Sequence, residues 1–397
     1  MTKIFTSLLL FAAIMQAAGQ PVRHSANIGI VYPLSTNGTH AWQYHNYFSL
    51  NVIAGVSAAE DGLCLSGVSN IVRDSANGLM AAGAINIVGG NEHGLQLAGV
   101  MNKAGNVTGA QFAGLLNLAS NVKGGQFSGL VNIALRNTAG AQFAGFVNKA
   151  GNVTAQFAGF SNKAVNLQGI QVAGFNNVVS GTAEGLQAAG FSNQAGNARA
   201  QVAGFMNKAN VVEGAQVAGF INVARQVKGV QVGLINIADS SDYPIGLVNL
   251  VKKGEKAIGV SVDETGTTMA TFRSGGRIMY GMIGAGINNY KSNGLYAVGA
   301  GIGAHVPVSR HFRMNVEAAV NTLTGFDGKY FFNTGVRLFP AVRVARFEMF
   351  AGPSINFDAY SRNLDILPAH AAVWTDKYYN EKHAVHIGAI CGVQLHM

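Results

Sequence analysis

Three histidines near the C-terminus, His383, His386 and His396, have a spacing that could suggest a metal site. A zinc ion needs ligands that converge on one point. In an extended strand His386 and His396 share a face, whereas His383 lies at the start of the strand beside a long polar segment. We therefore expect surface histidines here and no bound metal.

Two further segments look only weakly like functional motifs. Asp263 and Glu264 lie in an Asp-Glu-Thr-Gly turn, where Asp and Gly are favoured for backbone reasons. Gly299, Gly301 and Gly303 are spaced as in a nucleotide-binding loop, but they alternate along one strand and no helical pattern follows them. The chain has no P-loop, serine triad or Cys-x-x-Cys pair, so we expect no enzymatic activity and no cofactor.

A short repeat occupies residues 62–251 and must position most of the polar side chains. Its clearest mark is Gly-x-x-Asn, which recurs thirteen times at spacings of 13 to 16 residues, and a glutamine lies six residues before most of these asparagines. Stacked turns would place equivalent amides about 4.8 Å apart, close enough to bond in ladders. The predicted ladder residues are Gln96, Asn102, Gln111, Asn117, Gln126, Asn132, Gln142, Asn148, Gln171, Asn177, Gln216 and Asn222.

The alternation within one copy of the repeat indicates how the copies stack. In an extended chain, five side chains of one copy fall on one face: Gln142, Ala144, Phe146, Asn148 and Ala150. A face that recurs in every copy is expected to meet its own image on the next copy. The other face, which begins at Phe143 and ends at Lys149, varies. The repeat therefore predicts a parallel β-solenoid, with an antiparallel meander of short strands as the alternative.

Longer strands with a period of two follow the repeat. Phe347, Met349 and Ile355, for example, alternate with Glu348 and Asp358. Such segments fit membrane-spanning β-strands, which need about 9–11 residues. We expect an antiparallel barrel, with a soluble β-sandwich as the alternative. The eight predicted strands lie at residues 257–263, 267–273, 277–290, 295–306, 311–320, 330–339, 347–358 and 384–396.

The predicted barrel has consequences for its charged residues. Eight strands make the smallest common barrel, whose interior is filled by side chains. We expect Arg313, Glu317, Arg337 and Glu348 to point into this interior and to pair with one another.

The ends of the chain and its composition complete the domain plan. Residues 1–19 have the order of a secretory signal peptide, with Lys3, an apolar stretch and small residues. Residues 20–61 are expected to form a lead-in and cap, and residues 252–397 the barrel-like domain.

The net charge of +9 favours anionic partners, but the basic residues are too scattered to indicate nucleic-acid binding. Cys64 and Cys391 are expected to be buried free thiols, with a long-range disulfide as the alternative.

Several sequence segments are more specific than the general repeat. They include Gln171–Asn177, Gln216–Asn222, the exit segments 229–240 and 245–249, and the downstream segments Phe272-Arg273-Ser274-Gly275 and Phe350–Ser354. In these segments the chain resembles a family of surface-repeat envelope proteins of Bacteroidota and spirochaetes. The resemblance covers nearly the whole mature chain and implies an exported outer-membrane or surface protein.

Together these patterns favour a non-enzymatic cell-envelope protein that presents a repeat scaffold from an outer-membrane anchor. The variable side chains of the repeat, among them Lys103, Lys149, Lys163 and Lys208, would contact an envelope protein or glycan. The alternative is a transport or channel component whose repeats plug or extend the barrel. We expect the chain in the outer membrane or at the cell surface, with the periplasm as the alternative. No pattern in the sequence indicates an oligomeric state.

Overall fold

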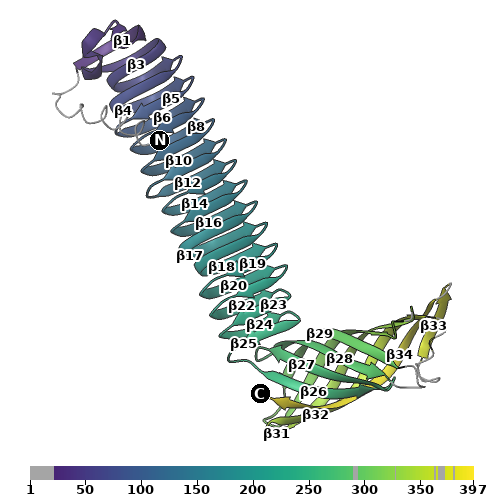
Figure 1. Cartoon of the computed structure of the whole chain (residues 1–397). Coiled ribbons are helices and arrows are strands. Elements are labelled where there is room, and N and C mark those ends of the chain that lie inside the picture. Colours follow the sequence, from purple (N-terminus) through teal and green to yellow (C-terminus); the bar gives the residue numbers. More distant parts are fainter. Residues whose placement is uncertain (1–21, 289–293, 327, 362–363, 365–371, 379–380) are drawn as a thin grey trace. The chain divides into compact units, whose positions relative to one another are not determined.

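Strands make up 79% of the protein, and helix is almost absent from the described residues, which confirms the predicted all-β fold. The computed structural model (Figure 1) describes residues 22–288, 294–326, 328–361, 364, 372–378 and 381–397. The predicted signal peptide lies outside the described residues. The chain forms two compact units, residues 1–196 and 197–397.

The first unit is a parallel β-solenoid that begins with a small cap. The cap consists of β1 (Val22–Val31), β2 (Leu34–Ser35) and the 3-10 helix η1 (Gly38–Gln43). The solenoid strands are β3 (Tyr44–Ser66), β4 (Ser69–Ala82), β5 (Ile85–Val88), β6 (Asn91–Ala98), β7 (Met101–Lys103), β8 (Asn106–Ala113), β9 (Leu116–Ala119), β10 (Asn121–Ser128), β11 (Val131–Ala134), β12 (Thr138–Ala144), β13 (Val147–Lys149), β14 (Asn152–Ala158), β15 (Ser161–Ala164), β16 (Asn166–Ala173), β17 (Asn176–Ala189) and the start of β18 (Ser192–Ala203).

Neighbouring turns of the first unit pair in parallel with equivalent residues side by side. Gln126 of β10 lies beside Gln111 of β8 and Gln142 of β12. This pairing confirms the solenoid, and the antiparallel meander is wrong. The turns stack directly because the repeat supplies small residues where they approach most closely. A Cβ atom on Gly114 would lie only 2.1 Å from the carbonyl oxygen of Gly99.

Each turn is flattened and consists of two strands joined by a bend. The chain bends at Gly145 and Phe146, between β12 and β13. Gln142 and Asn148 on either side are fully buried, whereas Phe146 is 49% exposed. The prediction that Phe146 shares the inner face was therefore wrong, because the bend interrupts the strict alternation of an extended strand.

The second unit contains further solenoid turns and an antiparallel barrel. The solenoid strands after β18 are β19 (Met206–Lys208), β20 (Val211–Ala218), β21 (Ile221–Val223), β22 (Gln226–Val232), β23 (Ile235–Ala238), β24 (Ser240–Ile245) and β25 (Val248–Val251). The antiparallel strands are β26 (Lys256–Asp263), β27 (Thr267–Gly275), β28 (Met279–Asn288), β29 (Leu295–Pro307), β30 (Phe312–Thr324), β31 (Tyr330–Val344), β32 (Phe347–Ser361), β33 (Ala372–Tyr378) and β34 (Glu381–His396).

Eight of these antiparallel strands close into a barrel, as predicted. β26 pairs with both β27 and β34, so that Val260 lies beside Ala270 on one side and Val393 on the other. Because the sheet closes on itself, the β-sandwich alternative is wrong. The ninth strand, β33, was not predicted, and among the described residues it pairs with the first part of β34 alone.

The last solenoid turn is bonded directly to the barrel. The backbone N–H of Asn249 in β25 donates to the Ser274 hydroxyl in β27 at 3.0 Å, and the Asn249 side-chain amide donates to the Ser274 carbonyl oxygen at 3.3 Å. A Cβ atom on Gly281 of β28 would lie 2.0 Å from the carbonyl oxygen of Gly246. Within the second unit, solenoid and barrel are therefore in close contact.

Candidate functional site

Buried asparagines form a hydrogen-bonded ladder inside the first unit. The Asn117 side-chain amide donates to Oδ1 of Asn132 at 2.9 Å and to the carbonyl oxygen of Phe127 at 2.7 Å, and Oδ1 of Asn117 accepts from Asn102 at 3.0 Å. Asn132 in turn donates to Asn148 at 2.9 Å. Each asparagine thus bonds both the next asparagine and the next backbone, at about 0.5–1.5 kcal/mol per bond.

The glutamines form a second buried row. Gln126 donates to Oε1 of Gln111 at 2.9 Å, and Gln142 donates to Oε1 of Gln126 at 2.7 Å. In the second unit, Gln216 accepts from Gln231 at 3.0 Å. The structure thus places all twelve predicted ladder residues inside the solenoid turns, each at most 1% exposed: Gln96, Asn102, Gln111, Asn117, Gln126, Asn132, Gln142, Asn148, Gln171, Asn177, Gln216 and Asn222.

A third row of amides, on the outside of the opposite bend, was not predicted. Asn106 donates to Asn91 at 2.9 Å, Asn121 donates to Asn106 at 2.8 Å, and Asn166 donates to Asn152 at 2.8 Å. The sequence carries a signal for this row, since an asparagine recurs seven or eight residues before many of the Gly-x-x-Asn glycines.

Two buried carboxyl groups lie near the cap end of the first unit. Glu60 accepts hydrogen bonds from the Ser49 hydroxyl at 2.8 Å and from Asn46 at 3.1 Å. Glu92 is 1% exposed and lies between Ala76 and Val107 of the neighbouring turns. Among the described residues neither of its oxygens has a hydrogen-bond partner. This burial raises the pKa of Glu92 to about 8.

Two rows of apolar side chains run along the outside of the first unit. The face row projects from the long strands and comprises Leu65, Leu97, Phe112, Phe127, Phe143 and Phe157. The bend row lies at the bends and comprises Val68, Val100, Leu115, Leu130, Phe146, Phe160 and Phe175. Consecutive phenylalanine rings stack with centroids 4.5–5.1 Å apart in the face row and 4.8–5.0 Å apart in the bend row.

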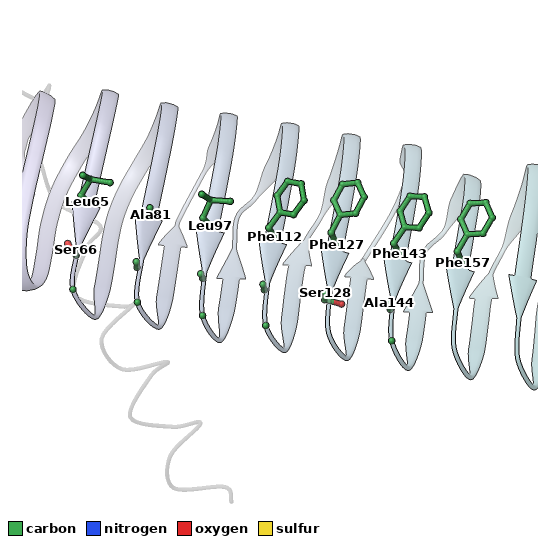
Figure 2. Close-up of a pocket in the computed structure, with 18 of the residues that line it drawn as sticks. Leu65, Ser66, Ala81, Leu97, Phe112, Phe127, Ser128, Phe143, Ala144 and Phe157 are labelled. Carbon is green, nitrogen blue, oxygen red and sulfur yellow. The ribbon is translucent and has the colours of Figure 1, made fainter.

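An apolar groove of about 1090 Å³ follows the face row. Figure 2 shows the face-row side chains projecting in the same direction from successive strands. The floor consists of Ala, Ser and Gly at the end of each long strand, among them Ala113 and Gly114. The only polar side chains in the lining are those of Asn51, Ser66 and Ser128. The groove therefore suits an apolar occupant.

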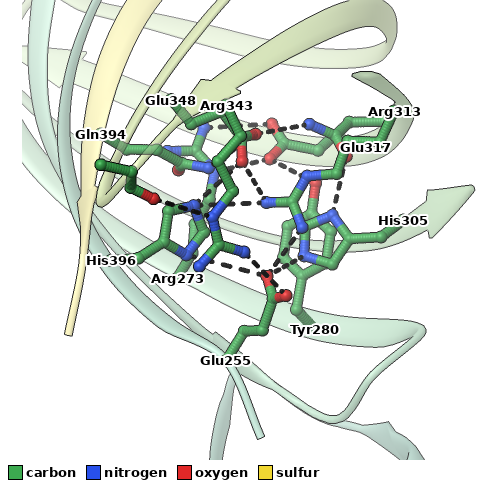
Figure 3. Close-up of polar contacts among 12 residues, drawn as sticks. Glu255, Arg273, Tyr280, His305, Arg313, Glu317, Arg343, Glu348, Gln394 and His396 are labelled. Atoms are coloured by element: carbon green, nitrogen blue, oxygen red, sulfur yellow. Dashed lines mark hydrogen bonds and ion pairs between the residues drawn. The ribbon is translucent and has the colours of Figure 1, made fainter. Parts of the chain in front are cut away.

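The barrel interior contains buried ion pairs centred on Glu317 (Figure 3). Glu317 pairs with Arg273 Nε at 2.7 Å and accepts from the Tyr280 hydroxyl at 2.8 Å. Its other oxygen lies 4.0 Å from Arg337 Nη1. Glu317 is 1% exposed, so these groups neutralise one another away from solvent.

A second group of the same network surrounds Glu348 (Figure 3). Arg313 Nη2 lies 2.5 Å and His396 Nε2 lies 2.9 Å from one Glu348 oxygen, and Gln394 donates to the other at 3.0 Å. Arg313 also donates to Glu255, which precedes β26, at 2.7 Å. The prediction that Arg313, Glu317, Arg337 and Glu348 face inward and pair is confirmed.

His386 joins a separate group inside the barrel. Its Nε2 lies 2.5 Å from Glu264, and its Nδ1 bonds Asp358. His386 is fully buried and His396 is 5% exposed, whereas His383 is partly exposed. The expectation of surface histidines was therefore wrong for His386 and His396, because the face they share is the inner one. Glu264 lies in the predicted turn but reaches into the interior.

The outer wall of the barrel is apolar, in contrast to the charged interior. Val260, Val298, Val336, Met349 and Ile387 are between 48% and 65% exposed. Strands β27–β32 carry seven charged side chains, of which six are buried inside: Arg273, Arg313, Glu317, Arg337, Glu348 and Asp358. The seventh, Arg343, is partly exposed near the end of β31.

The two cysteines are free, but only Cys64 is buried. Cys391 is exposed, so the expectation of two buried thiols was wrong for it. The outward-facing position in β34 explains the difference, because neighbouring residues of the strand alternate between interior and outer wall.

No helix in the described part of the chain has the length and apolar content that a membrane crossing requires. The described residues also contain no group of three or more His, Cys, Asp or Glu side chains arranged to hold a metal ion. Comparison with known protein families, curated proteins and solved structures finds no match to this chain.

Proposed function

We propose that this chain is a non-enzymatic protein of a bacterial outer membrane, in which the barrel is the anchor and the repeats form a scaffold for an envelope protein or glycan. The observation that carries the proposal is the inverted polarity of the barrel. Six of the seven charged side chains of strands β27–β32 are buried inside, and the outer wall of these strands is apolar.

The outer wall would be unfavourable in water. A soluble monomer rarely exposes a continuous apolar patch of more than a few hundred Å². A bilayer reverses this penalty, and a closed barrel leaves no unpaired backbone groups in the lipid. Strands of 13 to 15 residues in β29–β32 exceed the about 9–11 residues that a tilted crossing needs.

The connections between strands favour a periplasmic position for the repeats. Lys256 and His396 lie at one rim of the barrel, where the chain enters from the solenoid and where it ends. The connections at this rim have two to four residues, at 276–278, 308–311 and 345–346. The opposite rim carries one short connection, 264–266, and three longer ones, 289–294, 325–329 and 362–380. Outer-membrane barrels place short turns in the periplasm and longer loops outside.

The packed interior favours an anchor over a channel. A cavity beside Arg337 and Asp263 has a volume of only about 10 Å³, roughly enough for one water molecule. Arg337, which lines this cavity, lies 4.0 Å from Glu317 of the buried ion-pair network. Purified protein should therefore show no steady conductance in planar bilayers, and an open conductance would favour the transport alternative.

A lysine introduced on the outer wall of the barrel tests whether the barrel is a membrane anchor. Val336 is 55% exposed near the middle of β31. A lysine near the bilayer midplane costs about 2–4 kcal/mol, so Val336→Lys should lower the folding equilibrium constant in lipid vesicles roughly 30- to 700-fold. Folding is measured by heat-modifiable mobility on gels at increasing urea concentration.

The matched control is Leu135→Lys, on the outside of the solenoid, where the native leucine is 65% exposed. This variant should fold like the wild type because its new charge stays in water. The anchor proposal is wrong if Val336→Lys also folds like the wild type, or if the exported protein is a folded soluble monomer without detergent.

A further inference from the structure

We propose that the groove of the first unit is a homodimer interface, in which the bend row of a second copy of this chain docks against the face row. The bend row is unusually exposed for a set of large apolar side chains. Phe146 is 49%, Leu130 is 48% and Leu115 is 46% exposed. Stacking along each row covers the ring faces but leaves the ring edges in water.

The groove floor offers little to a polar partner. The backbone N–H groups of Gly114 and Gly145 already donate to Ala98 and Ser128 of the preceding turns, at 3.1 and 3.2 Å. An added peptide strand would therefore find these donors occupied. A glycan would meet mainly Leu, Phe, Ala and Gly. The apolar side chains and the occupied backbone donors of the groove therefore favour an apolar occupant.

The spacing of the rows selects the kind of apolar occupant. The rings repeat every 4.5–5.1 Å along the groove, which is the rise of one solenoid turn. A partner that packs against many turns must carry side chains with the same spacing. The bend row of a second copy has that spacing, at 4.8–5.0 Å. Two copies can exchange bend row and groove reciprocally, as a two-fold dimer requires.

The available area is sufficient for a stable dimer. A large aromatic side chain can bury about 150–250 Å², so a phenylalanine that is 39–49% exposed still offers on the order of 80 Å². The two rows together offer on the order of 800 Å² per copy, which is the share of one partner in a standard protein interface.

A lysine in the bend row tests the dimer in the full-length protein. Phe146 and Val165 are both 49% exposed, but Val165 lies at the opposite bend, outside the two rows. In a non-ionic detergent at micromolar concentration, light scattering should give the mass of two chains for the wild type and for Val165→Lys. Phe146→Lys should be monomeric, with its dissociation constant raised at least tenfold. Heat-modifiable mobility checks that each variant is folded.

Disulfide crosslinking provides a second test that does not depend on weakening the interface. In a Cys391→Ser background, Phe160→Cys chains are mixed in turn with Phe112→Cys, Phe127→Cys or Phe143→Cys chains, which carry the cysteine in the face row. Mild oxidation should give an interchain disulfide in at least one of these mixtures, and in none of the same mixtures made with Val165→Cys chains. A monomeric wild type, an unchanged mass for folded Phe146→Lys, or equal crosslinking at both positions would overturn the proposal. So would native mass spectrometry that shows one chain with a bound lipid displaced by Phe146→Lys.

Discussion

Replacing Glu92 with glutamine should stabilise the first unit in a strongly pH-dependent way. Glu92 is 1% exposed, between Ala76 and Val107 of adjacent turns. Burial raises the pKa of its carboxyl group from the usual 4.5 to about 8. The folded state therefore holds a proton that the unfolded chain releases at neutral pH.

The sign and size of the effect follow from this difference in proton binding. Below pH 4.5 both states are protonated, and the titration of Glu92 has no influence on folding. As the pH rises from 4.5 to about 8, ionisation of Glu92 stabilises the unfolded chain by about 1.4 kcal/mol per pH unit. The free energy of unfolding falls by the same amount, and this is a loss of stability for the folded state. At pH 7 this loss amounts to about 3 kcal/mol. Glu92→Gln removes it.

Hydrogen exchange measures the effect where it occurs. The opening free energy of amides in residues 85–103 is compared between wild type and Glu92→Gln at pH 4.5 and pH 7. The buried amide adds an offset that is equal at both pH values, so the difference between the two pH values isolates the charge. The control is Glu184→Gln, at an exposed position of the same unit. Its effect on the opening free energy should not differ between pH 4.5 and pH 7. A Glu92→Gln effect that is equal at both pH values would refute the reasoning.

Two further substitutions test the buried polar networks. Asn117→Ala removes the donor to Asn132 and to the Phe127 carbonyl oxygen, and leaving these groups unpaired should cost about 2–5 kcal/mol in local opening, measured by hydrogen exchange in the adjoining turns. Glu317→Gln leaves the buried Arg273 charge without its partner. This variant should lower the free energy of unfolding of the barrel by about 3–5 kcal/mol, measured by heat-modifiable mobility in a urea titration. An unchanged urea midpoint would show that the ion pair is dispensable.

The repeat and the barrel were predictable because both rest on strict periods. Equivalent Gln and Asn residues recur at one position in each copy, and only stacked turns bring such positions together. The alternation of Glu348 and Asp358 with Met349 and Phe357 likewise assigned the inner and outer faces of β32 correctly.

The features that were missed depend on bends and on contacts between distant strands. Phe146 occupies the same parity as Asn148, and no period-2 pattern shows that the chain bends between them. His386 has partners in Glu264 and Asp358, which are far from it in sequence. The strand β33 lies in a long connection between β32 and β34, and it has no partner besides β34 among the described residues.

The solenoid and the barrel both bury rows or networks of polar side chains, so the apolar side chains on their outer surfaces indicate what each of them contacts. In the solenoid, the ladders satisfy the buried amides turn by turn, and the longest continuous rows of exposed apolar groups, the face row and the bend row, run side by side along the first unit. In the barrel, the charges neutralise one another inside, and the apolar groups surround the whole wall. A surface that is apolar all round needs a continuous apolar solvent, whereas a single apolar edge needs only one partner. This distribution of exposed side chains is the basis of both proposals, a membrane around the barrel and a matching protein surface for the repeats.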